Sequence, residues 1–184
     1  MSATLVDRTP STSGGTGSPS RAAGGLGDVS QIVSFRLANE EYGVDIMRAQ
    51  EIIMLGQITR MPEVPDFIRG LINLRGHVIP ILDLRRRFNL AVKDDDEQTR
   101  IIVVNVESKT IGIVVDAVTE VLRISAEQIE PPPSSVAGID HEYIRGLLKL
   151  ENRIVTLLDI GHVLSASDQA AIADGTHSAV ESQG

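Results

Sequence analysis

An internal repeat is the feature that most constrains the fold of this 184-residue chain. Residues 67–84 align with residues 143–160 without a gap, and apolar residues coincide at nearly every position that is not identical. We therefore predict two copies of one small β unit, with chance convergence of two short apolar hairpins as the alternative. The identical pairs are Ile68 and Ile144, Arg69 and Arg145, Gly70 and Gly146, Leu71 and Leu147, Leu74 and Leu150, Leu82 and Leu158, and Asp83 and Asp159.

Turn residues inside the repeat favour hairpins. Arg75-Gly76 in the first copy occupies the place of Glu151-Asn152 in the second. Gly and Asn tolerate the positive φ that a tight two-residue turn demands. Each predicted hairpin is followed by an aspartate that can cap a short helix, Asp83 before residues 84–88 and Asp159 before residues 160–164. Upstream, Gly43 and Glu51 have the same spacing as Gly112 and Glu120.

Composition supports a β fold. Hydrophobic residues make up 42% of the chain and aromatic residues 3%, with no Trp, so the core must consist mainly of Val, Ile and Leu. The runs 101–104 and 111–115 resemble strands buried on both faces. Val33, Phe35 and Leu37 alternate with polar residues, which indicates a strand with one solvated face.

The chain divides into a body and two tails. Each half of the body has about 60 residues, too few for a secure independent core, so the halves should pack together. Ser167 is a plausible N-cap for a short helix near the C-terminus. The predicted regions are a flexible tail over 1–29, a body over 30–165 with halves at roughly 42–88 and 111–164, and a short helix with a flexible tail over 166–184.

Several functional classes receive little support. A net charge of −8 argues against nucleic-acid binding, and the absence of Cys fits a reducing compartment such as the cytoplasm. No secretory signal or membrane span is predicted. The four histidines lack metal-ligand spacing, and the acidic loop 94–97 reads as solvated rather than as a calcium site. We predict no cofactor, no metal and no enzymatic activity, with a small β-barrel hydrolase as a remote alternative.

The chain resembles the CheW-like domain family over residues 30–165. The resemblance implies a mainly β fold of two intertwined five-stranded SH3-like β-barrels with short helices and a shared hydrophobic core. The departures are the long N-terminal tail, Leu71 and the small Ala49. The segments that carry the resemblance are Ile58 to Arg85, Tyr42 to Ile46, Gln50 to Ile52, Gly112 to Asp116 and Ala126 to Ile129.

The resemblance also implies a function. Proteins of this family are expected to act as adaptors that link the cytoplasmic tips of chemoreceptors to the regulatory domain of the histidine kinase CheA. This chain would then be a cytoplasmic monomer when free, recruited to receptor arrays, with no membrane contact except through receptors. An alternative is a similar adaptor of a non-flagellar system, for pili or development. The residues that contact the kinase are not indicated.

A receptor-binding groove is predicted around a presumed helical turn. Ile46, Ala49 and Ile52 are three residues apart and would share one face of such a turn. That face would either be buried in its own barrel or receive an amphipathic helix. The resemblance favours the groove and adds Val33, Arg75 and Val115 to it.

Four residues are predicted to shape the turn and the groove. We hypothesise that Arg75 pairs with Glu51, the alternative being a solvated turn arginine. Gly76 would supply a positive φ, and Gly70 a bend or a close approach. Asn73 could close the turn by bonding to backbone.

Overall fold

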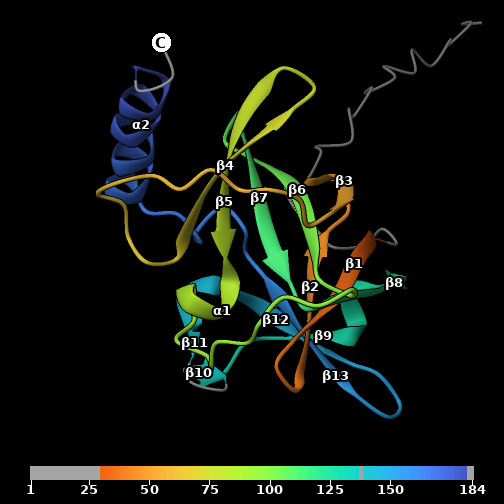
Figure 1. The fold of residues 1–184 in the computed structure, drawn as a ribbon. Coiled ribbons are helices and arrows are strands. Elements are labelled where there is room, and N and C mark those ends of the chain that lie inside the picture. The colour runs from red at the N-terminus through yellow and green to blue at the C-terminus, as the bar shows by residue number, and fades with distance from the viewer. Residues whose placement is uncertain (1–29, 137–138, 182–184) are drawn as a thin grey trace, which may run out of the picture.

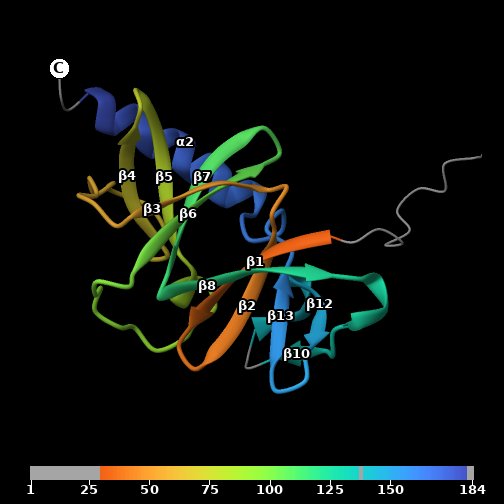
Figure 2. The ribbon, with the colours of Figure 1, turned by 90° about the vertical axis from the view of Figure 1, so that its right-hand side faces the viewer.

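The computed structural model describes residues 30–136 and 139–181, and it has the mainly β architecture that the sequence predicts (Figure 1). The predicted N-terminal tail, residues 1–29, lies outside the described residues. Two sheets carry almost all the strands, and Figure 2 shows one below the other, with a long helix behind the upper sheet.

The six-stranded sheet has the order β8 (Ala117–Ile124), β1 (Ser30–Leu37), β2 (Glu40–Asp45), β13 (Ile154–Leu158), β12 (Ile144–Lys149) and β9 (Ile129–Glu130). The five-stranded sheet has the order β3 (Ala49–Met54), β6 (Arg100–Val106), β7 (Lys109–Val115), β5 (His77–Asp83) and β4 (Ile68–Leu74). The remaining elements are β10 (Ser135–Val136), β11 (Ile139–Asp140), α1 (Leu84–Arg87), α2 (Ala166–Glu181) and the 3-10 turns Ala126–Gln128 and His141–Tyr143.

The two repeats exchange strands. The first repeat places β1 and β2 in the six-stranded sheet and β3, β4 and β5 in the five-stranded sheet. The second repeat does the reverse, because β6 and β7 join the five-stranded sheet while β8, β12 and β13 join the other. The barrels are therefore intertwined, as predicted, and neither sequence half, 42–88 or 111–164, forms either of the two large sheets alone. The described chain passes between the sheets at Ile46–Arg48, from β2 to β3, and at Asp116, from β7 to β8.

The registers of the two repeated hairpins match. In β4 the pairing shifts between Ile68 and Gly70, and in β12 it shifts between Ile144 and Gly146, so the same bulge falls at the same point of both repeats. The parallel neighbours match as well, since β5 pairs with β7 as β13 pairs with β2. The prediction that the hairpins are equivalent is confirmed.

Three apolar clusters fill the molecule. One lies inside each barrel, around Ile81 and Ile101 in the five-stranded sheet and around Leu148 and Leu157 in the six-stranded sheet. The third and largest is shared between the sheets. It gathers all five aromatic residues of the chain, Phe35, Tyr42, Phe67, Phe88 and Tyr143. The predicted shared core is therefore confirmed, and it joins two halves that would be marginal alone.

The C-terminal helix is longer and better anchored than predicted. α2 has 16 residues, and its cap is Ser165 rather than Ser167. The Ser165 hydroxyl accepts from the Asp168 amide at 3.2 Å, and the Asp168 carboxylate accepts from the Ser165 amide at 2.9 Å. Ile172 of α2 is buried in the shared core. Apolar burial therefore makes α2 part of the body, which the polar composition of the segment concealed.

Two further local predictions need correction. Asp83 caps α1, accepting from the amides of Arg85 and Arg86, but Asp159 is followed by turns and not by the predicted helix over 160–164. Ser34 does not lie on a solvated face of β1. It is fully buried and donates a hydrogen bond to the Glu120 carbonyl at 3.1 Å.

Candidate functional site

The turn between β4 and β5 has the predicted geometry. Leu74 pairs with His77, which leaves Arg75 and Gly76 as a two-residue loop with φ values of 52° and 85°. The Asn73 side-chain oxygen accepts from the Gly76 amide at 2.9 Å. Two successive positive φ values match the right-handed twist of a hairpin, so this loop projects rigidly from the sheet.

Arg75 and Glu51 pair as hypothesised. The Arg75 guanidinium donates two hydrogen bonds to the Glu51 carboxylate, at 3.0 and 2.9 Å. The pair braces the β4–β5 turn against β3, the strand at the opposite end of the sheet order. Because the Arg75 side chain is 75% exposed, the pair stabilises the fold by only about 0–1 kcal/mol.

The segment that follows β2 is not the helical turn that was predicted. Residues 46–48 form one tight turn, in which the Arg48 amide donates to the Asp45 carbonyl at 2.9 Å and the Ala49 amide donates to the Ile46 carbonyl at 3.1 Å. Ala49 then begins β3, so Ala49 and Ile52 lie on an edge strand. Pairing with β6 overrides the helical spacing, because strand hydrogen bonds satisfy this backbone.

The predicted groove residues differ in accessibility. Val33 and Val115 are 2% and 1% exposed and belong to the shared core, so they support the surface from beneath without forming it. Ile46 and Ala49 are partly buried against that core. Ile52 is 43% exposed. The alternative of a buried face therefore holds in part for Ile46 and Ala49, while Ile52 is accessible to a partner.

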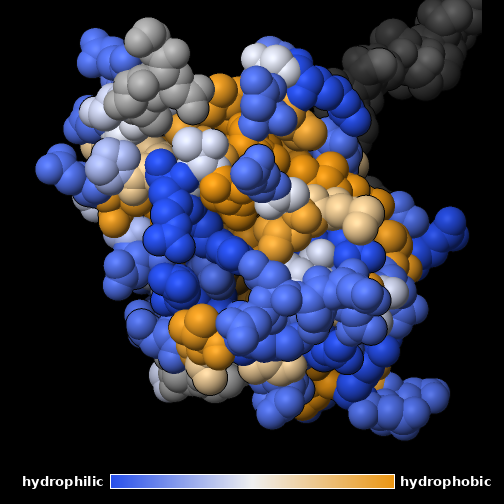
Figure 3. Space-filling model, viewed as in Figure 1, coloured by the Kyte–Doolittle hydropathy of each residue, from blue (hydrophilic) through white to orange (hydrophobic). Residues whose placement is uncertain are grey.

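Two methionines complete an apolar surface that sequence reasoning missed. Met47 is 86% exposed and Met54 73%, and both adjoin the predicted set. The signal available in the sequence was an apolar residue at alternate positions of the edge strand, Ile52 and Met54. The docking surface is defined as Ile46, Met47, Ala49, Ile52 and Met54. Figure 3 shows hydrophobic surface over the region where Figure 1 draws the five-stranded sheet.

A cavity of about 460 Å³ adjoins the docking surface at the turn after β2. Ser30, Gln31 and Arg123 line it from the six-stranded sheet, beside Asp45, Ile46 and Met47. Flexible methionine side chains beside such a hollow can repack around a partner. The surface therefore has contributions from both sheets.

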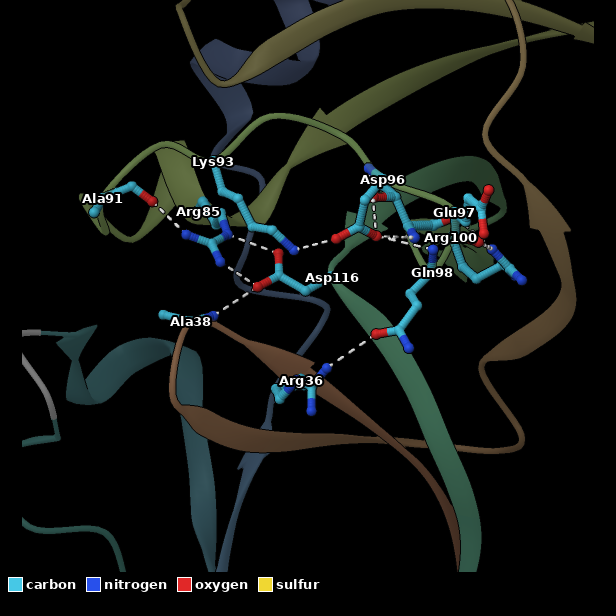
Figure 4. A network of polar contacts seen from close by, with 11 residues as sticks. Arg36, Ala38, Arg85, Ala91, Lys93, Asp96, Glu97, Gln98, Arg100 and Asp116 are labelled. Atoms are coloured by element: carbon cyan, nitrogen blue, oxygen red, sulfur yellow. Dashed lines mark hydrogen bonds and ion pairs between the residues drawn. The ribbon is translucent and has the colours of Figure 1, made fainter.

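A polar network lies at the other passage between the sheets (Figure 4). Arg85 donates from Nε to one Asp116 oxygen at 2.6 Å and from a terminal nitrogen to the other. These bonds to Asp116 raise the pKa of Arg85 above its ordinary value. In β2, burial raises the pKa of Tyr42 to about 12, with a smaller contribution from Glu40.

The model of the CheW-like domain family matches residues 31–168. This chain belongs to the CheW-like domain family. Its members with curated names include "Chemotaxis protein CheW" of Klebsiella aerogenes, 44% identical over 142 residues that cover 77% of this chain and 86% of the relative. "Protein FrzA" of Myxococcus xanthus is 30% identical over 141 residues, 76% of this chain and 88% of the relative.

A solved CheW structure has the same fold. The scaffolding protein TtCheW from Thermoanaerobacter tengcongensis aligns with a TM-score of 0.71 and 37% identity, over 77% of this chain and 91% of that one. The resemblance and the fold class predicted from the sequence are thus confirmed for this CheW-like domain. The family is one of scaffold proteins.

Within residues 30–136 and 139–181, no group of three or more His, Asp and Glu residues is placed to hold a metal ion. Asp83 and Asp159, equivalent by the repeat, both accept hydrogen bonds from nearby backbone amides. No helix in the described part of the chain is long and apolar enough to cross a membrane.

Proposed function

We propose that this protein is a non-enzymatic adaptor that links the cytoplasmic tips of chemoreceptors to the regulatory domain of the histidine kinase CheA. Membership of the CheW-like family supports the class of function, and 44% identity to a relative named Chemotaxis protein CheW supports the chemotaxis system. The adaptor acts in the cytoplasm, is monomeric when free, and reaches the membrane only through receptors.

The exposed docking surface is the observation that carries the proposal. A receptor tip is expected to present an amphipathic helix, and such helices bind apolar grooves through residues spaced along one face. Met47, Ile52 and Met54 supply exposed apolar contacts, and the small Ala49 leaves room between them. The Arg75–Glu51 pair holds the neighbouring turn in place. The family resemblance implies that the CheA regulatory domain packs against the ends of the barrels, so we propose that kinase binding uses a second surface.

Reconstitution tests the proposal. Receptor-bearing membranes and CheA are mixed with the chain, and autophosphorylation of the kinase is measured. We expect activation with the wild type, and its loss with Met47→Arg and Ala49→Arg, because each places a charge where an apolar helix would pack. Val92→Arg is the matched control, since Val92 is also exposed, at 66%, but lies in the loop after α1.

Separate binding assays decide between one partner surface and two. The Met47 and Ala49 variants should lose receptor binding and keep CheA binding. Equal loss of both partners in a folded variant would refute the two-surface proposal. Absence of activation by the wild type would refute the adaptor role itself.

A second candidate is an adaptor of a non-flagellar system for pili or development. The similarity to a relative with a different name, Protein FrzA, supports this second candidate. Capture of the partner kinase from the source cell, followed by its identification, separates the two. A small hydrolase gains no support, because Asp83 and Asp159 act alike as backbone acceptors.

A further inference from the structure

The two passages between the sheets are built differently. The Ile46–Arg48 turn is open to solvent, and its Asp45 pairs only loosely with Arg145, at 3.7 Å. At Asp116 the side chain is 11% exposed and holds three donors. The chain makes a further connection from β13 to α2, where Arg87 of α1 donates to the Val163 carbonyl at 2.8 Å. Of the two passages from strand to strand, the one at Asp116 is the more strongly bonded.

Asp116 bonds to both sheets at once (Figure 4). Its Oδ2 accepts from the Ala38 amide at 2.9 Å, in the turn between β1 and β2 of the six-stranded sheet. Both of its oxygens accept from Arg85, in α1 directly after β5 of the five-stranded sheet. The Asp116 amide donates to the Arg36 carbonyl at 3.0 Å, and Arg85 also donates to the Ala91 carbonyl at 2.5 Å.

We propose that Arg85 and Asp116 are positioning residues that fix the relative position of the two sheets and thereby the shape of the docking surface. The inference rests on the proposed function for its binding consequence, but not for its geometry. The shared core holds the sheets together but does not fix their relative orientation, because the hydrophobic effect is non-directional and the buried apolar area changes little with small rotations. Hydrogen bonds to a carboxylate are directional and short, so this pair selects one relative position.

The docking surface depends on that position. Ile52 and Met54 belong to the five-stranded sheet, whereas the adjoining cavity is lined from the six-stranded sheet by Gln31 and Arg123. A shift between the sheets changes the separation of these two sides. A partner helix that contacts both sides would then lose part of its complementarity, while a partner on one barrel end would not.

The chain supplies a matched control pair. Arg69 and Asp95 also form two hydrogen bonds, at 2.9 and 2.6 Å, with side chains 26% and 36% exposed. Arg69 is on β4 and Asp95 is in the segment between α1 and β6, so both lie within the part of the chain that builds the five-stranded sheet. Loss of this pair should not affect the relation between the sheets.

Distance measurement between spin labels tests the positioning directly. The chain has no cysteine, so His77→Cys and Asn152→Cys, at exposed ends of the two equivalent hairpins, give one label on each sheet. We expect a wider distance distribution when Arg85→Lys or Asp116→Asn is added, and an unchanged one with Arg69→Lys. The amide oxygen in Asp116→Asn can still accept the hydrogen bond from the Ala38 amide. Thermal melts show which of the variants fold.

Binding assays test the consequence. A receptor-tip fragment should bind the Arg85→Lys and Asp116→Asn proteins about three- to tenfold more weakly, with CheA binding nearly unchanged. An unchanged distance distribution in a folded variant overturns the positioning role, as does equal widening with Arg69→Lys. Unfolding of both variants overturns it too, because the pair would then serve global stability. Widening without weaker receptor binding overturns the link to docking. Failure of the wild type to bind any receptor fragment contradicts the proposed function alone.

Discussion

The β4–β5 and β12–β13 hairpins share a register but not a turn. Arg75 and Gly76 both have positive φ, whereas neither Glu151 nor Asn152 does, contrary to the sequence prediction for the second copy. The second turn is closed instead by the Leu150 amide, which donates to the Arg153 carbonyl at 2.9 Å. Strand register depends on buried alternation that both repeats keep, while a solvent-exposed turn is free to differ.

The charges beside the turns show the same contrast. Glu51 and Glu120 are equivalent by the repeat, and each pairs with an arginine near its hairpin turn, Arg75 and Arg153 respectively. Arg153, however, lies beyond the repeat counterpart of Arg75 and also reaches Glu41, at 3.4 Å. Both repeats therefore have an arginine–glutamate pair beside the hairpin turn, although the two arginines are not at equivalent positions. A long arginine side chain can reach the equivalent carboxylate from neighbouring positions.

The outer faces of the equivalent edge strands differ more. Ile52 on β3 corresponds to Val121 on β8, and both are exposed, at 43% and 49%. Met54 corresponds to Arg123. Only the first of these strands therefore continues an apolar surface toward the turn after β2. The repeats therefore share a framework of buried positions and differ in the residues at its solvated positions.

The largest expected effect separates Gly70 from Gly146. Gly70 has φ 143°, and a Cβ there would lie 2.0 Å from the Thr59 carbonyl oxygen, so Gly70→Ala should destabilise the fold by about 3–4 kcal/mol. Gly146 lacks a positive φ, and a Cβ there would lie 2.6 Å from the Ile129 side chain and 2.9 Å from the Glu130 carbonyl oxygen. Without the backbone strain of a positive φ, Gly146→Ala should cost less than Gly70→Ala, about 2–3 kcal/mol. Urea unfolding measures both, and equal losses would contradict the distinction.

An alkaline effect should distinguish Tyr42 from its repeat counterpart Ile111. The folded state holds the Tyr42 proton more tightly than the unfolded state, whose pKa is near 10, since burial raises the folded pKa to about 12. The contribution of Tyr42 to the free energy of unfolding is therefore fully present below pH 10. It falls as pH rises toward 12, by about 1–2 kcal/mol between pH 10 and 11.5. Tyr42→Phe should remove this loss. Parallel pH dependence in wild type and variant would exclude Tyr42 as the source.

A smaller effect should separate the turns. Gly76→Ala places a Cβ on a residue with φ 85° and should cost about 1–2 kcal/mol. Asn152→Ala should change stability by less than about 0.5 kcal/mol, because Asn152 needs no special φ. Thermal melts of the two variants give the comparison. A larger loss at Asn152 would show that the second turn is the more constrained.

Charge reversal at the two braces should barely affect stability. Arg75→Glu and Arg153→Glu should each change the free energy of unfolding by about 0.5 kcal/mol or less, because both arginines are exposed. Binding should separate them, since only Arg75 stands beside the docking surface. A receptor fragment should bind Arg75→Glu more weakly and Arg153→Glu normally. Equal weakening would place Arg153 in the receptor interface as well.

The sequence alone determined the repeat, most of the longer strands and the turn at Arg75-Gly76. Each depends on local pattern or on residues whose backbone preference is strong. The Arg75–Glu51 pair was a hypothesis that depended on the family resemblance, and the structure contains it. The sequence also led to the family, because the motif around the first hairpin is specific. The helical turn at Ile46 and the cap at Ser167 were wrong, since local spacing there competes with contacts that the sequence does not display.

Tertiary structure decided the exchange of strands between repeats, the burial of Val33 and Val115, and the anchoring of α2. It also brought Arg85 to Asp116 and left Met47 and Met54 exposed. A pattern of apolar residues indicates that one face of an element is buried, but it does not indicate which other element covers that face. That choice is made by pairings between segments far apart in the chain, whose combined free energy outweighs local preference.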